Sequence, residues 1–300
     1  AIAYLWKTIG TSCIHLPQAH AVVKLWRAVL DAVAPGFLLI TETNVPHADN
    51  ISYFGEPLPE TGSTDEAQLV YNFSLAPLTL HALKEGDASH LSRWAATLKP
   101  PSKAATFFNF IASHDGIGVL PARGILDEAE VQGLVDRTLA HGGRVSYKAN
   151  PDGSASVYEL NITLYDFLND PAAPQIETDV RRFLASQAIL LALAGVPGIY
   201  VHSLFGSRNC HRCFAETGRA RSLNREKFDI AGLEAMLADP DGHTGRVFDG
   251  YRTLLRVRQG ERAFHPLGGQ KVLDLGPAIM AVLRLPPGER GPAGGPAGGR

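Results

Sequence analysis

Short apolar runs of strand length alternate along this chain with longer segments of helical periodicity, and this alternation restricts the possible folds more than any other feature. Strands that are buried on both faces and connected through helices indicate a parallel sheet. An α/β fold is therefore predicted, and a doubly wound sheet and a (β/α)8 barrel both fit it. The apolar runs lie at 37–41, 69–75, 106–112 and 199–204. The helical segments lie at 17–33, 78–98, 127–141, 176–194 and 247–257.

Polar residues at the ends of the apolar runs favour the barrel. They fall at or just past the C-terminal ends, which form the rim where the catalytic residues of a (β/α)8 barrel gather. Four strands make half of such a barrel, so residues 1–262 are predicted to form a partial catalytic barrel. Within it, residues 116–175 are predicted to be a long loop insertion, either a lid or a substrate-binding segment. The polar residues are Glu42, Asn44, His114, Asp115 and His202.

The C-terminal part of the sequence changes in character. Residues 263–285 are predicted to be short strands that begin a small β-domain. Residues 286–300 are rich in Gly and Pro and hold little apolar surface to pack, so a disordered tail is predicted there.

Composition narrows the class of protein. The net charge of −2 gives no reason to expect nucleic acid or an acidic membrane as a partner. No apolar run is long enough to cross a membrane. The three cysteines are too few and too scattered for a secreted disulfide scaffold and suit a reducing cytosol, so a cytoplasmic location is predicted. Cys210-His211-Arg212-Cys213 resembles half a zinc site, but no second cluster accompanies it, and no metal is expected.

Three polar segments are candidates for chemistry. A carboxylate such as Glu42 at the mouth of a buried strand has its pKa raised by burial, as a general acid requires, although Glu42 could instead cap a helix or form an ion pair. The His114-Asp115 pair is followed by two glycines that let the backbone turn sharply on a ligand, although a capped turn also explains it. The basic run 219–227 suits hydroxyl pairs or phosphate, or is a solvated surface.

Taken in order, these motifs resemble the sucrose phosphorylase-like family of the α-amylase superfamily, glycoside hydrolase family 13. The resemblance extends over roughly residues 1–285. Its motifs are residues 1–4, Gly-Thr-Ser-Cys at 10–13, Thr-Glu-Thr-Asn at 41–44, Val-Tyr-Asn-Phe-Ser-Leu at 70–75, His-Asp-Gly-Ile-Gly at 114–118, Val-Tyr-Glu-Leu-Asn at 157–161, residues 195–200 and Ser-Leu-Asn-Arg at 222–225.

The resemblance implies strands five to eight of the barrel and a role for several residues. Glu42 matches the general acid/base, Asp115 the transition-state stabiliser, and His114 a neighbour that binds sugar hydroxyls. Substrate-binding positions are implied for the remaining matches. They are Arg225, on the glucosyl ring, and Tyr4, Tyr158 and Glu159, which line the acceptor site.

The same resemblance implies a retaining α-glucoside phosphorylase, which transfers a glucosyl group from an α-glucoside to inorganic phosphate without a cofactor. A glucosidase or transglucosidase of the superfamily and a non-catalytic fragment are the alternatives. Segments 14–18 and 202–209 look more like glucosylglycerate and sucrose 6′-phosphate phosphorylases than sucrose enzymes. Arg208 could bind an anionic acceptor or pair with an acid.

The sequence also departs from the family pattern. The family nucleophile is an Asp in an Arg-Leu-Asp-Ala run, and this sequence begins at the matching Ala1. We therefore expect an N-terminally truncated chain that is inactive and poorly folded alone, because both edges of a half-barrel would be unpaired.

Overall fold

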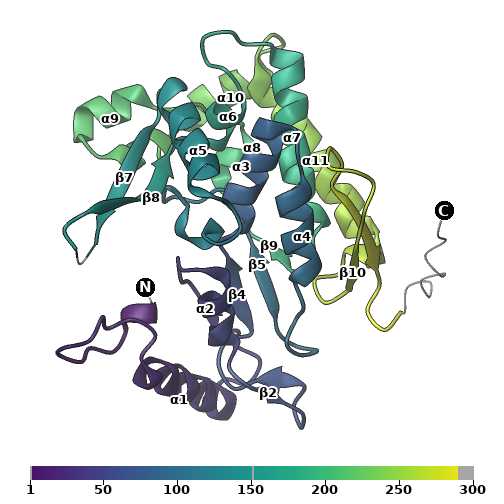
Figure 1. The fold of residues 1–300 in the computed structure, drawn as a ribbon. Coiled ribbons are helices and arrows are strands. Elements are labelled where there is room, and N and C mark those ends of the chain that lie inside the picture. The colour runs from purple at the N-terminus through teal and green to yellow at the C-terminus, as the bar shows by residue number, and fades with distance from the viewer. Residues whose placement is uncertain (1, 151, 290–300) are drawn as a thin grey trace, which may run out of the picture.

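A parallel sheet forms the centre of the computed structural model, which describes residues 2–150 and 152–289 (Figure 1). The strands neighbour one another in the order in which they follow along the chain, and helices fill the connections between them. This arrangement confirms the predicted α/β class with a parallel sheet. The strands are β1 (Ile40–Thr41), β4 (Leu69–Asn72), β5 (Thr106–Asn109) and β9 (Val196–Pro197).

Two asparagines tie the middle of the sheet together. Asn72 on β4 pairs in register with Asn109 on β5, and the Asn72 side chain donates to the Asn109 side-chain oxygen at 3.0 Å. The Asn109 amide donates in turn to the carbonyl of Ala194, just before β9, at 2.8 Å. Both asparagines are fully buried, so their amide groups donate to protein oxygens across the sheet rather than to water.

All four predicted strands are longer than the strands that form. The runs 69–75 and 106–112 form strands only over their first four residues, β4 and β5, and the other two runs differ more. The run 37–41 forms a ladder only at Ile40–Thr41, and Phe37 and Leu38 are exposed because β1 is the edge of the described sheet. The run 199–204 is not a strand: α8 (Val201–Leu204) replaces it, and the strand is β9, earlier in the chain. A short apolar run fits a helical turn as well as a strand, and apolarity alone could not separate them.

Helices pack on the sheet mostly where periodicity predicts them. Pro at the first helical position begins α1, whose ends match the prediction. The predicted helix 78–98 is two helices, because Gly86 adopts a left-handed conformation (φ 69°) that ends the first. The helices at predicted positions are α1 (Pro17–Val33), α3 (Leu75–Glu85), α4 (Ser89–Thr97), α7 (Ile176–Ala192) and α11 (His243–Gly260), whereas α2 (His47–Ile51) was not predicted.

Residues 116–175 are largely ordered secondary structure rather than open loop. Their strands form an antiparallel sheet in the order β6-β8-β7 (Figure 1). This sheet packs against α5, and its strand β6 contacts α3. Asp127 and Glu130 form a capping box that begins α5. Whether this unit is a lid stays a prediction. It contains β6 (Ile117–Gly118), α5 (Glu128–Ala140), β7 (Arg144–Ala149), β8 (Ala155–Asn161) and α6 (Leu164–Leu168).

A hairpin of β10 (Gly269–Leu273) and β11 (Ala281–Leu285) closes the described chain and packs near α4. Its assignment to a separate β-domain stays a prediction, and residues 290–300 of the predicted tail lie outside the described residues. The remaining elements are η1 (Ile2–Tyr4), η2 (Ser52–Phe54), β2 (Pro57–Leu58), β3 (Ser63–Thr64), η3 (Leu120–Ala122), α9 (His211–Thr217), η4 (Ala220–Asn224), α10 (Ile230–Ala238) and η5 (Arg262–Phe264).

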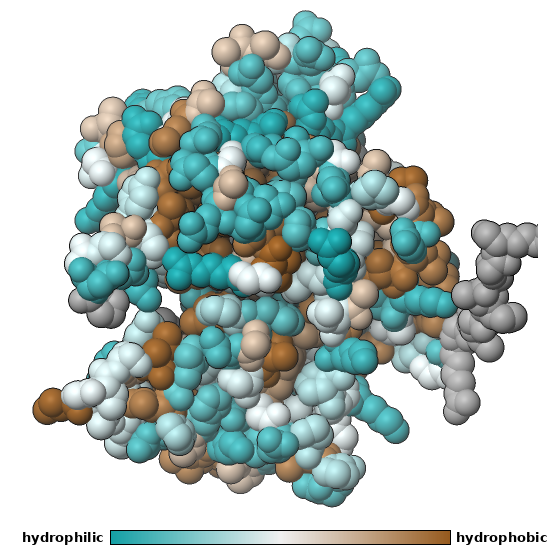
Figure 2. Space-filling model, viewed as in Figure 1, coloured by the Kyte–Doolittle hydropathy of each residue, from teal (hydrophilic) through white to brown (hydrophobic). Residues whose placement is uncertain are grey.

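Apolar residues are not confined to the interior. Figure 2 shows hydrophobic surface among the hydrophilic residues of the face viewed in Figure 1. One exposed stripe runs along α1 and continues past its end, and we call it the α1 apolar face. Among the helices of the described residues, none is long and apolar enough to cross a membrane. The α1 apolar face consists of Leu25, Trp26, Val29, Val33, Phe37 and Leu38.

Candidate active site

A cavity of about 210 Å³ opens where β1, β4 and β5 end, and β8 contributes Tyr158 and Glu159 to its wall. Parallel strands bring their carboxyl ends to one edge, so residues distant in sequence meet there. Five of the seven predicted site residues line this cavity: Glu42, His114, Asp115, Tyr158 and Glu159. The other lining residues are Asn44, Tyr71, Phe73, Phe110, Ser113 and Gly116.

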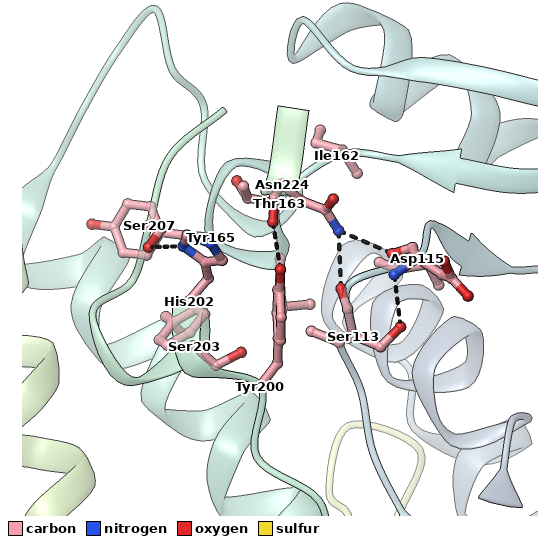
Figure 3. A pocket seen from close by; sticks show the side chains of 14 residues that line it. Ser113, Asp115, Ile162, Thr163, Tyr165, Tyr200, His202, Ser203, Ser207 and Asn224 are labelled. Atoms are coloured by element: carbon pink, nitrogen blue, oxygen red, sulfur yellow. Dashed lines mark hydrogen bonds between the residues drawn. The ribbon is translucent and has the colours of Figure 1, made fainter. Parts of the chain in front are cut away.

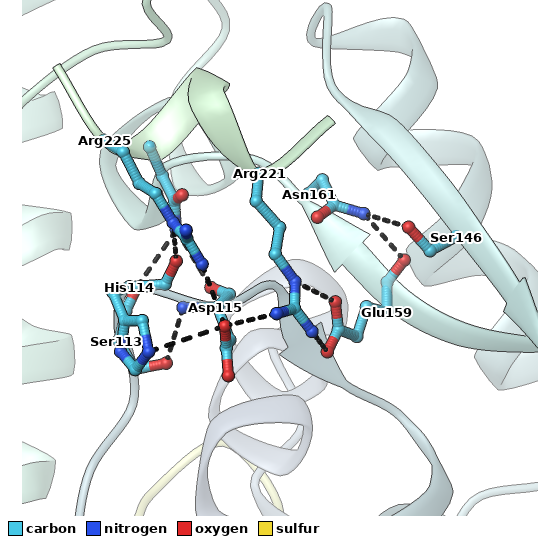
Figure 4. A network of polar contacts seen from close by, with 9 residues as sticks. Ser113, His114, Asp115, Ser146, Glu159, Asn161, Arg221 and Arg225 are labelled. Atoms are coloured by element: carbon cyan, nitrogen blue, oxygen red, sulfur yellow. Dashed lines mark hydrogen bonds and ion pairs between the residues drawn. The ribbon is translucent and has the colours of Figure 1, made fainter. Parts of the chain in front are cut away.

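Asp115 is the most heavily bonded group in the site (Figure 4). One carboxylate oxygen of Asp115 accepts from Arg221 at 2.6 Å and from Arg225 at 2.9 Å, and the His114 ring lies 3.6 Å away. Arg225 also donates to the carbonyl of His114. Two charge-assisted contacts to one oxygen fix the direction of the Asp115 carboxylate.

Arg221 joins this carboxylate to a second one. Its Nη2 and Nε donate to the two oxygens of Glu159 at 2.6 Å and 3.1 Å, and Glu159 is only 3% exposed. The hydrogen bonds and the charge of Glu159 raise the pKa of Arg221. This ion pair links β8, which bears Glu159, to η4, which bears Arg221. It gives the buried Glu159 side chain a partner that it would otherwise lack.

Asn224 holds the backbone of the Ser113-His114-Asp115 segment from behind (Figure 3). Its side-chain amide donates to the carbonyls of Ser113 at 3.0 Å and Asp115 at 2.9 Å. Tyr200 donates to the Asn224 carbonyl at 2.8 Å, and burial raises the pKa of the Tyr200 phenol. A small cavity of about 20 Å³ lies among these residues, with room for one water molecule.

The two glycines after Asp115 allow neighbouring residues to pack directly against the backbone. Neither Gly116 nor Gly118 has a positive φ, so the sharp turn expected from the sequence is not their function. A Cβ on Gly116 would lie 2.9 Å from Cβ of Glu159, and one on Gly118 would lie 2.6 Å from Nδ2 of Asn44. These glycines therefore let β6 pack tightly against β8 and the end of β1.

Two of the sequence expectations differ from the structure. Glu42 is exposed rather than buried, because it lies at the open edge of the sheet, so the burial expected to raise its pKa is missing. The charge of Glu42 still adds to burial in raising the pKa of Tyr71. Tyr4 does not line the cavity and packs instead on the apolar cluster around Tyr53.

Sequence reasoning did not single out Arg221 or Asn224 as site residues, although the basic run 219–227 that contains both was a candidate. The four-residue spacing between Arg221 and Arg225 was the available signal, because it lets both side chains reach one group from a single helical turn. Arg208 donates to the buried Asp166 at 2.8 Å, so the pairing alternative holds for it rather than an unoccupied anion site.

The cysteines also differ from expectation. Cys210 and Cys213 are joined by a disulfide, whereas a reduced state suited the predicted cytosol, and Cys13 is free. Cysteines three residues apart at the start of a helix can approach closely, which the sequence analysis weighed only for zinc. Within residues 2–150 and 152–289, no group of three or more metal-ligating side chains could hold a metal ion. The cytoplasmic location stays a prediction.

The fold places the chain among α/β proteins whose polar site lies at the carboxyl edge of a parallel sheet. The sucrose 6F-phosphate phosphorylase of Thermoanaerobacter thermosaccharolyticum has the same fold, with a TM-score of 0.75 over 94% of this chain and 52% of that chain, at 23% identity. No protein-family model matches the sequence.

Sequence comparison identifies the relatives. The glucosylglycerate phosphorylase of Allomeiothermus silvanus is 52% identical over 290 residues, 96% of this chain and 50% of that protein. That of Escherichia coli is 41% identical over 95% of this chain and 50% of its own length. The sucrose phosphorylase of Bifidobacterium adolescentis is 26% identical over 80% and 45%.

The chain is thus a homologue of the glucosylglycerate phosphorylases and, more distantly, of the sucrose phosphorylases, and the resemblance predicted from its motifs is confirmed. The chain spans about half the length of the curated relatives that it matches.

Proposed function

We propose that the chain is the acid/base-bearing half of a retaining α-glucoside phosphorylase that acts on glucosylglycerate. The observation that carries this proposal is the 52% identity to a glucosylglycerate phosphorylase across 96% of the chain. Identity falls to 26–28% for the sucrose and sucrose 6(F)-phosphate phosphorylases, which favours the glycerate acceptor. Inorganic phosphate and the α-glucoside are the proposed substrates.

In this proposal Glu42 protonates the leaving glycerate oxygen and later takes a proton from phosphate. Its position at the cavity and its exposure allow a proton to pass in both directions. A second carboxylate, which attacks the anomeric carbon in retaining enzymes, would lie about 5–5.5 Å from the acid. In this proposal the nucleophile belongs to the other half of the parent protein, because the chain spans only about half the length of its curated relatives.

Asp115 stabilises the positive charge of the oxocarbenium-like transition state. Arg221 and Arg225 hold this carboxylate in one direction, so it need not reorganise as charge develops. His114 is 68% exposed beside it and presents ring nitrogens to sugar hydroxyls. Tyr158 and Glu159 shape the opposite wall, where burial and the Glu159 charge raise the pKa of the Tyr158 phenol.

The four parallel strands are proposed to be strands five to eight of a (β/α)8 barrel. Their sequential order and the coverage of about half of a sucrose 6F-phosphate phosphorylase support this assignment. The remaining strands would then come from the rest of the parent protein.

Product analysis of the full-length parent tests the function. Incubation with glucosylglycerate and inorganic phosphate is expected to release α-glucose 1-phosphate, with the α configuration seen in the anomeric proton NMR signal. Release of free glucose at the same rate without phosphate would identify a hydrolase instead. A β-configured product would rule out the retaining mechanism.

A further inference from the structure

The disulfide between Cys210 and Cys213 lies directly beside the segment that carries the site arginines. It spans the first turn of α9. The chain then runs through Gly218 into η4, which bears Arg221 and Asn224. None of the roles proposed above uses these cysteines, although they are only one short loop away from residues that bind Asp115.

Hydrogen bonds link both cysteines to η4, directly for Cys210 and through Thr217 for Cys213. The amide of Cys210 donates to the carbonyl of Leu223 at 2.8 Å. On the Cys213 side, Thr217 donates to the Cys213 carbonyl at 2.8 Å, and its hydroxyl lies 2.7 Å from the Ser222 hydroxyl. The disulfide fixes the spacing of these two anchors, so it also restrains the turn of η4 between them.

From η4 the restraint reaches the candidate site in one step. Asn224 holds the carbonyls of Ser113 and Asp115, and Arg221 holds Asp115 and Glu159. A shift of η4 would therefore move the groups that orient Asp115, and small misplacements of such groups are costly in catalysis.

The two sulfurs differ in access. Cys210 is 6% exposed, whereas Cys213 is only partly buried, and its neighbours His211 and Arg212 are exposed. An incoming thiolate can therefore reach the Cys213 sulfur. The leaving Cys210 sulfur accepts a hydrogen bond from the Cys213 amide at 3.2 Å, which favours it as a thiolate.

We propose that Cys210 and Cys213 form a thiol–disulfide exchange site whose oxidation state sets the order of η4, and thereby the positions of Arg221 and Asn224 at Asp115. The effect on catalysis rests on the proposed function; the exchange chemistry does not.

The reaction consumes a dithiol. A dithiol thiolate attacks Sγ of Cys213, which forms a mixed disulfide and releases Cys210 as a thiolate that takes up a proton. The second thiol of the reductant then attacks the mixed disulfide and frees Cys213. The protein disulfide gains two electrons and two protons, and the dithiol becomes a disulfide.

Cysteine labelling tests the exchange, with dithiothreitol as the dithiol. The full chain, unfolded after treatment and alkylated with N-ethylmaleimide, is expected to carry one label before reduction, on Cys13, and three after it. Oxidised dithiothreitol should restore the singly labelled form. Three labels in every condition, oxidant included, would overturn the proposal.

Hydrogen exchange tests the coupling to η4. Amide exchange over residues 219–225 is expected to rise at least about threefold on reduction and in Cys210→Ser/Cys213→Ser, while α7 stays unchanged. The matched control, Cys13→Ser, keeps the disulfide and should behave as the parent chain. Equal exchange over residues 219–225 in both redox states would show that the disulfide does not restrain η4.

Activity is the last measurement. In the full-length parent protein, reduction is expected to lower kcat/KM for glucosylglycerate about tenfold. If neither redox state turns over any glucoside, the proposed function fails while labelling and amide exchange still decide this inference. An unchanged kcat/KM with increased exchange in η4 would contradict the link to the site.

Discussion

The guanidinium of Arg221 lies 2.6 Å from a carboxylate oxygen of Asp115, on the segment that follows β5. The other two nitrogens of the same guanidinium donate to both oxygens of Glu159 on β8. One cation thus joins the antiparallel unit to the end of the central sheet. Its removal would leave the buried carboxylate of Glu159 without a partner, whereas Asp115 would keep Arg225.

Arg221→Met should therefore lower the free energy of unfolding by roughly 2–4 kcal/mol, because breaking a pair with a buried ion costs more than breaking a surface pair. The half-exposed Arg221 side chain keeps this below the upper limit for buried pairs. Urea unfolding followed by circular dichroism measures it. Arg212→Met removes an exposed ion pair to Glu216 and should cost less than about 0.5 kcal/mol. Equal losses in both variants would contradict the bridging role.

Glu42→Gln tests the acid role in the parent protein. Loss of the proton donor should lower kcat on glucosylglycerate by about 10²–10⁴-fold. A glucoside with an activated leaving group needs no proton to depart, so the variant should retain much more of its activity on that substrate. Steady-state kinetics on both substrates provides the comparison. The same loss on both would remove Glu42 from the acid role.

Local signals made the helices predictable from the sequence. Pro17 at the first helical position and the Pro35-Gly36 break bound α1, and the predicted ends match. The Gly86 stop was readable in the same way but was passed over. Strand β9 was misplaced because its position depends on pairing with Phe108 and Asn109, which no local pattern encodes.

Residue patterns alone predicted the candidate site only where its residues end a strand, and Tyr158 and Glu159 were found through the family motif. Glu42, His114 and Asp115 follow apolar runs and were found by that position. Arg221 reaches Asp115 from a distant turn, and a basic run at that point looked equally like solvated surface. The exposure of Glu42 depends on what lies beyond the sheet edge, which the residues around Glu42 do not determine.

The glycines of the site predict two different outcomes. Gly116→Ala places a Cβ 2.9 Å from Cβ of Glu159, which Arg221 holds in place, so stability should fall by about 1–3 kcal/mol. In Gly118→Ala the new Cβ contacts only the end of the Asn44 side chain, which can turn away. Stability should therefore change little, whereas kcat/KM should fall because Asn44 lines the cavity. Gly260→Ala, with no atoms within 4 Å, should be neutral or stabilising by about 0.5–1 kcal/mol. Thermal unfolding measures the stability of all three variants. A loss of stability in Gly260→Ala as large as that in Gly116→Ala would contradict the steric explanation.

Stability should fall as the pH is lowered below about 6.5, the ordinary pKa of histidine. Burial lowers the pKa of His202 and of His243. Below pH 6.5 the unfolded chain takes up protons that the folded chain does not, so unfolding is favoured until the lowered pKa is passed. Each histidine adds at most about 1.4 kcal/mol per pH unit.

Substitution of single histidines shows which of them causes this dependence of stability on pH. His243→Gln should reduce it, because glutamine can still donate to the Gly206 carbonyl but does not titrate. His211→Gln, on the exposed surface of α9, should leave it unchanged. Urea unfolding between pH 5 and 8 measures both variants. An unchanged slope in His243→Gln would remove that histidine from the explanation.

The α1 apolar face predicts self-association of the chain. Val33 is 74% and Phe37 66% exposed, and four more apolar residues continue the stripe. Several exposed apolar residues along one helix and just past its end favour contact with another apolar surface. Val33→Lys places a charge in that contact and should weaken self-association at least about tenfold, since burying a valine contributes roughly 1.5 kcal/mol or more.

Sedimentation equilibrium at several chain concentrations measures the association constant directly. Ile230→Lys is the matched control, because Ile230 is 78% exposed on α10 and is not part of the α1 apolar face. The control should associate like the unaltered chain, and circular dichroism should show that both variants fold. The interpretation fails if Val33→Lys and Ile230→Lys associate equally strongly. It also fails if the unaltered chain is monomeric at all concentrations, since the exposed stripe would then drive no contact.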